Sequence, residues 1–424
     1  MTEHIFTGFG FGPIQSGLFI KEAFQSGNFK RIVVAEIDQE LVDAVRANKG
    51  SYYINVAMTD RIEVLQIDNI ELLNPNVSED KQILLRVLDE STEISTSLPS
   101  VKFYNSGADN SVASLIANGL NNNNTPATII YTAENNNHAA EVLEKNITEK
   151  NGPLPAGRAQ FLNTVIGKMS GVVTDPDEIA ELKLKTIAPG INRAFLVEQF
   201  NRILVSKTTI ANFKPGIEVF IEKQNLLPFE EAKLYGHNAI HALLAYIGAV
   251  KGYSKMTELK DDKSIMQIAR EAFLNESGRA LIKKYSYLGD ELFTEAGYQN
   301  YTDDLLERMT NPYLTDTVAR AGRDPLRKLG INDRIFGTMA LALEYGIEPA
   351  NMALGAIAGI AVLIKEAEQN NLPDDLRLGD WCKLDELKIA KIIDWLWQKQ
   401  TSEHRQELIK CVYNAHRNLM DIAG

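Results

Sequence analysis

The first half of the chain alternates short apolar runs with stretches of helical spacing. Residues 4–10 form an apolar run that ends in glycines, residues 31–38 (RIVVAEID) form a β-branched run, and a helical pattern follows each of them. Further strand-like runs lie at 101–107, 127–135, 195–207 and 216–223. Strands that alternate with helices usually build a parallel sheet covered by helices. The pattern therefore predicts an α/β domain with a doubly wound parallel sheet over residues 1–226.

The pattern changes to helical periodicity after Leu226. Pro228 fits the first turn of a helix, where its missing N–H costs nothing. Apolar residues at helical spacing then recur in segments that include 241–250, 264–285, 333–346, 354–369 and 386–400. We therefore expect a mostly α-helical C-terminal domain over residues 227–424.

Composition narrows the class of protein. The chain has 424 residues, 45% of them hydrophobic, which is enough for two domain cores. A net charge of −12 without a clustered basic stripe argues against nucleic acid or an anionic membrane surface as a partner. The two cysteines form no disulfide or zinc pattern, and the N-terminus lacks the features of a signal peptide. No apolar run reaches the roughly 18 residues of a membrane span, so a soluble, cytoplasmic protein is expected.

The first strand-to-helix turn is rich in glycine. Gly8, Gly10, Phe11 and Gly12 form a turn in which backbone amides can approach a pyrophosphate in front of a helix N-terminus. Glu36 follows the next strand, where an acid accepts hydrogen bonds from adenosine ribose hydroxyls and repels a 2′-phosphate. We therefore predict a Rossmann-like domain that binds NAD in preference to NADP. The alternative is an ordinary tight turn with end-of-strand acids.

Polar groups gather at the start of a helix that is otherwise apolar. In an α-helix from about Pro228, Asn238 and His241 share a face, and Lys233 lies about 80° from His241 around the axis. A lysine beside a buried segment has a lowered pKa and can act as a general base, and an asparagine amide can donate to a reacting oxygen. Two alternatives stay open. His237 and His241 have metal-ligand spacing, although no glutamate or cysteine completes a zinc motif, and all these residues could be structural.

The spacing K-x4-N-x2-H, followed by A-x-x-A-Y-x-G, resembles the polyol-specific long-chain dehydrogenases, the mannitol dehydrogenase family. Three further blocks support the resemblance: NPYLTDTVARAGRDPLRKLGINDRIFG (311–337), ESGRALIKKYSY (276–287) and LALEYGI (341–347). The resemblance covers about residues 4–350. Within the family, these blocks are most similar to the mannitol-1-phosphate 5-dehydrogenases.

The resemblance implies an NAD-dependent, metal-independent hydride transfer. Lys233 would be the general base, Asn238 and Asn135 would donate to the reacting oxygen, and His241 would position the substrate. The implied reaction is mannitol 1-phosphate + NAD⁺ to fructose 6-phosphate + NADH. The implied partner is a small polyol or sugar phosphate.

Four cations lie within nine residues of the block 311–337: Arg320, Arg323, Arg327 and Lys328. Arginine binds phosphate through charge-assisted and sometimes bidentate hydrogen bonds, so the block is a candidate phosphate clamp. Asp324 and Asp333 are close enough in sequence for a structural ion-pair network instead, and one residue can serve both purposes.

Two departures from the family pattern bear on the cofactor and substrate sites. Pro13 and Ile14 stand where members commonly have a further glycine and an arginine, which leaves the pyrophosphate contacts open. The segment 77–100 is interpreted as a surface insertion or a lid.

Two alternative functions remain. One is reduction of an unphosphorylated ketose or a keto-uronate, as in mannitol 2-dehydrogenase or the fructuronate and tagaturonate reductases. The other is a catalytically silent NAD-binding sensor, because a fold does not fix a function.

Overall fold

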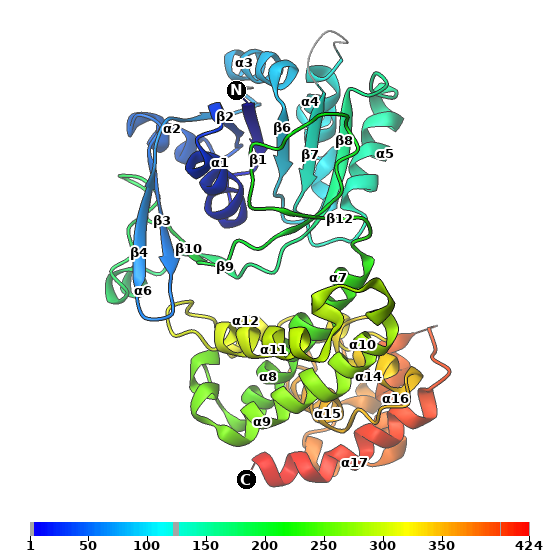
Figure 1. Cartoon of the computed structure of the whole chain (residues 1–424). Coiled ribbons are helices and arrows are strands. Elements are labelled where there is room, and N and C mark those ends of the chain that lie inside the picture. Colours follow the sequence, from blue (N-terminus) through cyan, green and yellow to red (C-terminus); the bar gives the residue numbers. More distant parts are fainter. Residues whose placement is uncertain (1–3, 122–126, 399, 424) are drawn as a thin grey trace. The chain divides into compact units, whose positions relative to one another are not determined.

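The computed structural model describes residues 4–121, 127–398 and 400–423 of the chain (Figure 1). Two compact units divide the chain, one over Met1–Leu227 and the other over Pro228–Gly424. The N-terminal unit is α/β and the C-terminal unit is helical, so the predicted fold class is confirmed.

An eight-stranded sheet forms the centre of the N-terminal unit, in the order β12-β11-β8-β7-β6-β1-β2-β5. Its strands are β1 (His4–Phe9), β2 (Phe29–Ala35), β5 (Ile70–Leu73), β6 (Glu93–Thr96), β7 (Thr128–Thr132), β8 (Ala159–Val165), β11 (Leu204–Ser206) and β12 (Ile221–Lys223). Neighbouring strands in the run β5-β2-β1-β6-β7-β8 are parallel, while β11 runs antiparallel to β8. The chain builds the sheet outward from β1 in both directions, so the strand order reverses between β1 and β6. That reversal is the switch point at which doubly wound sheets bind dinucleotides.

Both faces of this sheet are buried. In β1, Ile5 and Phe9 face one core, which contains residues of α3 (Ser78–Glu90), α4 (Val112–Gly119) and α5 (Ala139–Asn151). Phe6 faces the other core, which contains residues of α2 (Gln39–Ala47) and the π-helical turn Gln15–Ile20 that leads into α1 (Lys21–Ser26). Burial on both faces explains why these strands are continuous apolar runs in the sequence.

A second sheet packs against that core. It contains β3 (Tyr52–Ala57), β4 (Ile62–Ile67), β9 (Ser170–Val173) and β10 (Ala194–Glu198), in the order β4-β3-β10-β9. The helix α6 (Pro176–Glu181) lies between β9 and β10 in the chain. The run at 195–207 was expected to extend the main sheet. Its first part forms β10 of the second sheet, and only its last residues form β11.

Two predictions for residues 77–107 are wrong. The segment 77–100 is neither an insertion nor a lid, because it forms α3 and β6, and β6 pairs with both β1 and β7. Residues 101–107 are not a strand. Ser100 caps a 3-10 helix over Val101–Asn105, and 3-10 turns follow at Ala108–Asn110. The apolar signal failed here because the true strand, β6, carries the buried polar residues Glu93, Ser95 and Thr96.

Helices make up the C-terminal unit among its described residues. The α-helices are α7 (Leu227–Glu231), which begins at the boundary, α8 (Ala239–Lys251), α9 (Lys263–Glu271), α10 (Arg279–Tyr285), α11 (Glu295–Met309), α12 (Val318–Gly322), α13 (Pro325–Lys328), α14 (Arg334–Glu344), α15 (Ala350–Lys365), α16 (Glu386–Trp397) and α17 (Arg405–Ala423). Two π-helical segments, Ala232–Asn238 and Ala272–Gly278, join α7 to α8 and α9 to α10. Short 3-10 turns lie at Met256–Asp261, Ser286–Leu288, Glu291–Phe293, Asp374–Leu376 and Trp381–Lys383.

The helices α8 and α15 lie in the core of this unit. A Cβ atom at Gly355 would lie 3.1 Å from Leu243, and one at Gly359 would lie 3.0 Å from Tyr246. Glycines four residues apart therefore let α15 approach α8 closely. This packing fixes α8, which follows directly on the π-helical segment Ala232–Asn238.

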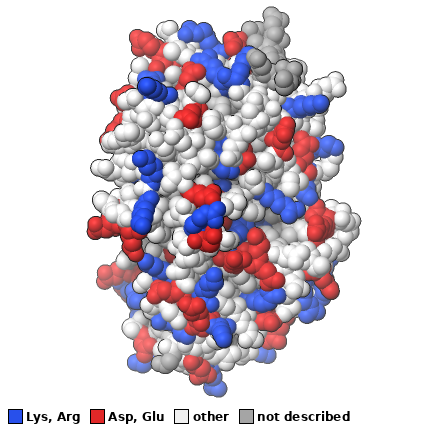
Figure 2. All heavy atoms as spheres, turned by 60° about the vertical axis from the view of Figure 1, so that its left-hand side comes forward, with Lys and Arg blue, Asp and Glu red and all other residues white. Residues whose placement is uncertain are grey.

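The surface carries charges of both signs. Figure 2 shows lysine and arginine interspersed with aspartate and glutamate on the face that it draws. Within the described residues, no helix is both long enough and apolar enough to span a membrane.

Candidate active site

The glycine-rich turn lies at the carboxyl end of β1. Gly10 has a φ of +82°, which favours glycine, and a Cβ atom there would lie 2.9 Å from the Ser97 carbonyl oxygen. A Cβ atom at Gly12 would meet nothing within 4 Å, so this position leaves room in front of the helix that Pro13 starts. The turn and the helix N-terminus fit the diphosphate of a dinucleotide.

Gln15 packs against the glycine-rich turn. Its side chain is buried and exchanges hydrogen bonds with the Ser95 hydroxyl at 2.7 and 2.9 Å. A Cβ atom at Gly8 would lie 2.0 Å from its Nε2 atom, so the glutamine occupies the space that Gly8 leaves. Gly17 permits the close packing of the helix, because a Cβ there would lie 2.5 Å from Val197.

Glu36 follows β2 and is bonded to the turn. Its Oε2 atom accepts from the Phe11 N–H at 2.7 Å, and its Oε1 atom accepts from the N–H groups of Ile37 and Asp38 at 2.7 and 2.9 Å. A carboxylate has about four acceptor positions, so one remains for a ribose hydroxyl. Asp38 instead caps α2 and pairs with Arg193 at 2.7 Å.

Asn135 is exposed on the loop after β7, at the same sheet edge as the glycine-rich turn, because β7, β6 and β1 are parallel neighbours. The preceding residue, Glu134, is buried and accepts from the Leu98 N–H at 2.8 Å and the Thr96 hydroxyl at 2.9 Å. Tyr104 also donates to it. These contacts anchor the loop that presents Asn135.

The other predicted catalytic residues lie in the C-terminal unit, where Lys233 and Asn238 belong to the π-helical segment and His241 to the first turn of α8. The predicted continuous α-helix is therefore wrong, and so is the angle derived from it. In an α-helix, residues five apart point about 140° away from each other. In a π-helix, the i→i+5 hydrogen-bond spacing brings residues five apart close to the same face. The π-turn thus places Lys233 and Asn238 near the same face of the helix.

The surroundings of Lys233 favour its neutral form. Burial, followed by the positive charge of Arg334, lowers the pKa of Lys233 from 10.5 to about 8, although Glu230 acts in the opposite direction. Its ammonium group makes no hydrogen bond to another described residue. An amine with a pKa near 8 can take a proton from an alcohol close to neutral pH.

His241 is held by a residue far away in the sequence. Its Nε2 atom lies 2.9 Å from Oδ2 of Asp316, and Arg320 donates from Nη1 to Oδ1 of the same carboxylate at 3.1 Å. Burial alone raises the pKa of Asp316, but the hydrogen bond and charge of His241 and the charge of Arg320 outweigh it and lower the pKa. Asp316 is therefore ionised near neutral pH.

The four cations of the arginine block have different surroundings. Arg320 pairs with Asp316, and Arg327 pairs with Asp324 at 2.7 Å. Lys328 is buried and donates to the Ala321 carbonyl at 2.5 Å. Burial, followed by the charges of Arg334, Arg327 and Arg323, lowers the pKa of Lys328 to about 7. The guanidinium of Arg323 is exposed and has no hydrogen bond or ion pair to a described residue.

A metal site would need further ligands beside the histidine pair. Burial, followed by nearby positive charges, lowers the pKa of His237 well below 6.5, so this side chain is neutral. Across the part of the chain that the structure describes, no three His, Cys, Asp or Glu side chains are grouped as metal ligands.

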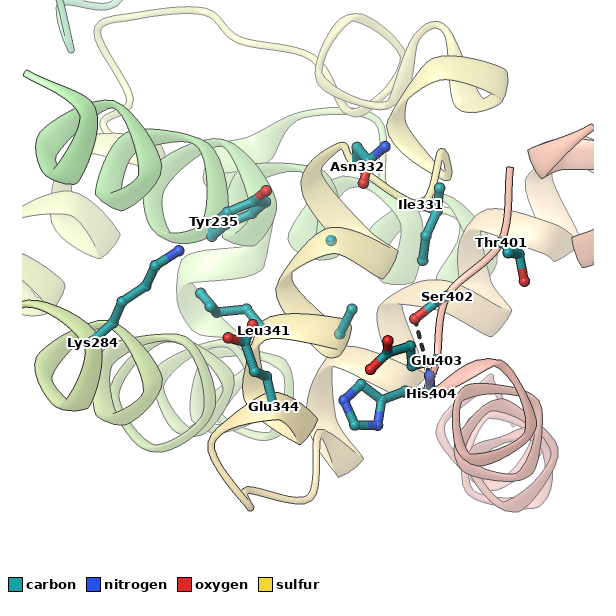
Figure 3. Close-up of a pocket in the computed structure, with 12 residues that line it drawn as sticks. Tyr235, Lys284, Ile331, Asn332, Leu341, Glu344, Thr401, Ser402, Glu403 and His404 are labelled. Atoms are coloured by element: carbon teal, nitrogen blue, oxygen red, sulfur yellow. Dashed lines mark hydrogen bonds between the residues drawn. The ribbon is translucent and has the colours of Figure 1, made fainter. Parts of the chain in front are cut away.

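A separate cleft lies close to the π-turn in the C-terminal unit. It has a volume of about 300 Å³, and Figure 3 shows Tyr235, Lys284, Glu344 and His404 around it. Lys233, Asn238 and His241 do not line this cleft. Lys284 is engaged by Glu231 at 2.8 Å. The cleft is therefore distinct from the predicted catalytic residues.

Two solved polyol dehydrogenases have a fold similar to that of this chain. The solved D-sorbitol dehydrogenase in substrate-free form superposes with a TM-score of 0.76 over 99% of this chain and 94% of that chain, at 15% identity. The Pseudomonas fluorescens mannitol 2-dehydrogenase, solved with NAD and D-mannitol, gives a TM-score of 0.67 over 99% and 92% of the two chains, at 17% identity. The fold is that of the polyol dehydrogenases.

Sequence comparison identifies the C-terminal domain and a group of similar enzymes. Residues 225–402 match the mannitol dehydrogenase C-terminal domain. The mannitol-1-phosphate 5-dehydrogenase of Buchnera aphidicola subsp. Acyrthosiphon pisum (strain Tuc7) is 29% identical over 358 residues, which cover 82% of this chain and 84% of that enzyme. The enzyme of the same name from Aureobasidium melanogenum is 28% identical over 344 residues, which cover 80% and 81%. The C-terminal unit therefore matches the mannitol dehydrogenase C-terminal domain, and the chain is an oxidoreductase similar to the mannitol-1-phosphate 5-dehydrogenases, as the resemblance predicted.

Sequence reasoning missed Asp316, Gln15 and the π-turn. Asp316 lies 75 residues from His241, so no local spacing connects them. Its position four residues before Arg320 was the available signal, because that spacing favours an ion pair on a helix.

Proposed function

We propose that this chain interconverts mannitol 1-phosphate and fructose 6-phosphate with NAD, using Lys233 as the general base. The observation that carries the proposal is the π-turn, whose geometry favours Lys233, with its lowered pKa, on the same side of the helix as Asn238. The names of the sequence relatives support the phosphorylated substrate. The exposed guanidinium of Arg323 supports it too, since it is available to an anion.

The chemistry follows from the side chains. In polyol oxidation, neutral Lys233 takes the proton of the reacting hydroxyl at Nζ while the hydride of the same carbon leaves. NAD, when bound, accepts that hydride. Asn238 and Asn135 donate N–H groups to the oxygen, on which negative charge develops as the proton departs. In ketone reduction, the protonated Lys233 returns the proton to that oxygen, and no metal is required.

Turn geometry supports NAD as the cofactor. Gly10 and Gly12 give the backbone access to a diphosphate, and Glu36 keeps a free acceptor position near the end of β2. A 2′-phosphate at that position would meet a carboxylate, so NADP is disfavoured.

The test is oxidation of NADH by the purified full-length protein, with and without EDTA. Fructose 6-phosphate, fructose, fructuronate and tagaturonate are offered separately at equal concentration, and NADPH replaces NADH in a second series. We expect turnover of fructose 6-phosphate with NADH, unchanged by EDTA.

The other outcomes discriminate between the alternatives. A preference for fructose or a uronate would overturn the phosphate assignment, although the lysine mechanism would stand. Loss of activity in EDTA would overturn the metal-independent mechanism. Binding of NADH without turnover of any of the four compounds would favour a catalytically silent sensor.

A further inference from the structure

Asp316 is a buried carboxylate that contacts two proposed substrate-binding side chains at once. One oxygen lies 2.9 Å from His241 Nε2 and the other lies 3.1 Å from Arg320 Nη1. The side chain of Asp316 is 9% exposed, whereas those of His241 and Arg320 are 22% and 47% exposed. The carboxylate therefore lies beneath two side chains that reach the surface of the C-terminal unit.

The backbone around Asp316 is fixed from both sides. The Asp316 carbonyl accepts from the Met256 N–H at 2.9 Å, and the Val318 N–H donates to the Ser254 carbonyl at 2.9 Å. Lys255 and Thr317 form an antiparallel bridge between the same two segments. Residues 254–256 lie shortly after the end of α8 at Lys251, so these backbone bonds tie the Asp316 segment to the chain that leaves the helix carrying His241.

An ionised carboxylate can only accept hydrogen bonds. The contact with Asp316 therefore requires a proton on Nε2 of His241. In a neutral imidazole the other ring nitrogen is then an acceptor. Nδ1 of His241 has no hydrogen-bond partner among the described residues, so its lone pair is available to a hydroxyl group.

We propose that Asp316 is a positioning residue that sets the tautomer of His241 and the orientation of Arg320 together. His241 then accepts a hydrogen bond from a substrate hydroxyl through Nδ1, while the same carboxylate holds Arg320 beside it. The substrate contacts rest on the proposed polyol dehydrogenase function, whereas the tautomer follows from the contact itself.

The first test needs no variant. The six histidines are labelled with ¹⁵N, and the ring-nitrogen shifts of His241 are assigned by comparison with His241→Gln. We expect the Nε2–H tautomer in the wild-type protein. An Nδ1–H tautomer would overturn the proposal even if every variant of Asp316 failed to fold.

The second test is Asp316→Asn, measured beside Asp262→Asn. Asp262 is a matched control, because its carboxylate also binds a side chain of α8, Lys251, at 2.7 Å. For Asp316→Asn we expect the Nδ1–H form of His241 to gain population and kcat/KM for fructose 6-phosphate to fall about 100-fold through KM, as small misplacements of binding groups do. The Kd of NADH should not change in either variant.

The two readouts separate this proposal from the function on which it rests. A tautomer change without activity on any sugar would keep the positioning role and contradict the proposed function. Equal kinetics for Asp316→Asn and Asp262→Asn, with an unchanged His241 tautomer, would reduce Asp316 to a structural ion pair.

Discussion

At the residue scale, hydrogen-bond partners distinguish two lysines that both have a lowered pKa. Arg334 is buried, lies at the start of α14 and lowers the pKa of both Lys233 and Lys328. The amine of Lys328 donates a hydrogen bond to the Ala321 carbonyl, whereas the amine of Lys233 makes no hydrogen bond to a described residue. Both lysines have a lowered pKa, but they differ in hydrogen bonding. This difference is why we propose a general base at Lys233 and a structural role for Lys328.

Arg323 is the residue at which the phosphate assignment can be tested most sharply. Replacement by alanine removes an exposed guanidinium without breaking an ion pair to any described residue. A charge-assisted hydrogen bond contributes about 1.5–3 kcal/mol, so we expect the KM for fructose 6-phosphate to rise about 10-fold to 100-fold in Arg323→Ala. Steady-state kinetics with varied sugar phosphate measures this.

The matched control is Arg279→Ala, which removes the same charge from an exposed position on α10. Its KM should equal that of the wild type. If both variants behave alike, Arg323 does not contact the phosphate.

At the element scale, two local irregularities create the positions of the proposed site residues. The π-turn at Ala232–Asn238 changes the direction of Lys233 relative to Asn238, and the turn after β1 opens space at Gly12. Neither irregularity stabilises a helix in isolation, because π geometry is rarely adopted and glycine has a high conformational entropy when unfolded. Both are retained by packing around them.

Gly8→Ala and Gly12→Ala form a matched pair of tests. We expect Gly8→Ala to lower the free energy of unfolding by about 1–3 kcal/mol, because the methyl group collides with Gln15. Gly12→Ala has open space, so stability should change little while NADH affinity falls. Denaturant unfolding and NADH fluorescence titration measure the two effects. Unchanged NADH affinity in Gly12→Ala would mean that the diphosphate does not approach this turn.

At the scale of the whole molecule, apolar periodicity correctly predicts the fold class but does not locate every strand. Continuous apolar runs such as β1 and β2 are recognisable because both faces of the sheet are buried. The strand β6 was missed because Glu93, Ser95 and Thr96 are buried through hydrogen bonds rather than by hydrophobicity. A pattern of apolar residues cannot detect a strand whose buried side chains are polar.

The same limit applies to the candidate site. Lys233, Asn238 and His241 are close in sequence, and their residue types alone suggested a base, a donor and a ligand. Their relative directions depend on a π-turn, and residue types and spacing gave no sign of that turn. The partner of His241 depended on tertiary structure.

The pH dependence of kcat/KM for mannitol 1-phosphate oxidation tests the central claim, that Lys233 is the general base, most directly. Only the neutral amine accepts a proton, so the rate constant should rise with pH and level off above a pKa of about 8. In fructose 6-phosphate reduction the protonated form is required, and the rate constant should fall above the same pH. Lys233→Ala should lose at least about 100-fold in the chemical step, show no such transition and still bind NADH. A flat profile in the wild-type enzyme, or a transition near pH 8 that persists in Lys233→Ala, would contradict the account.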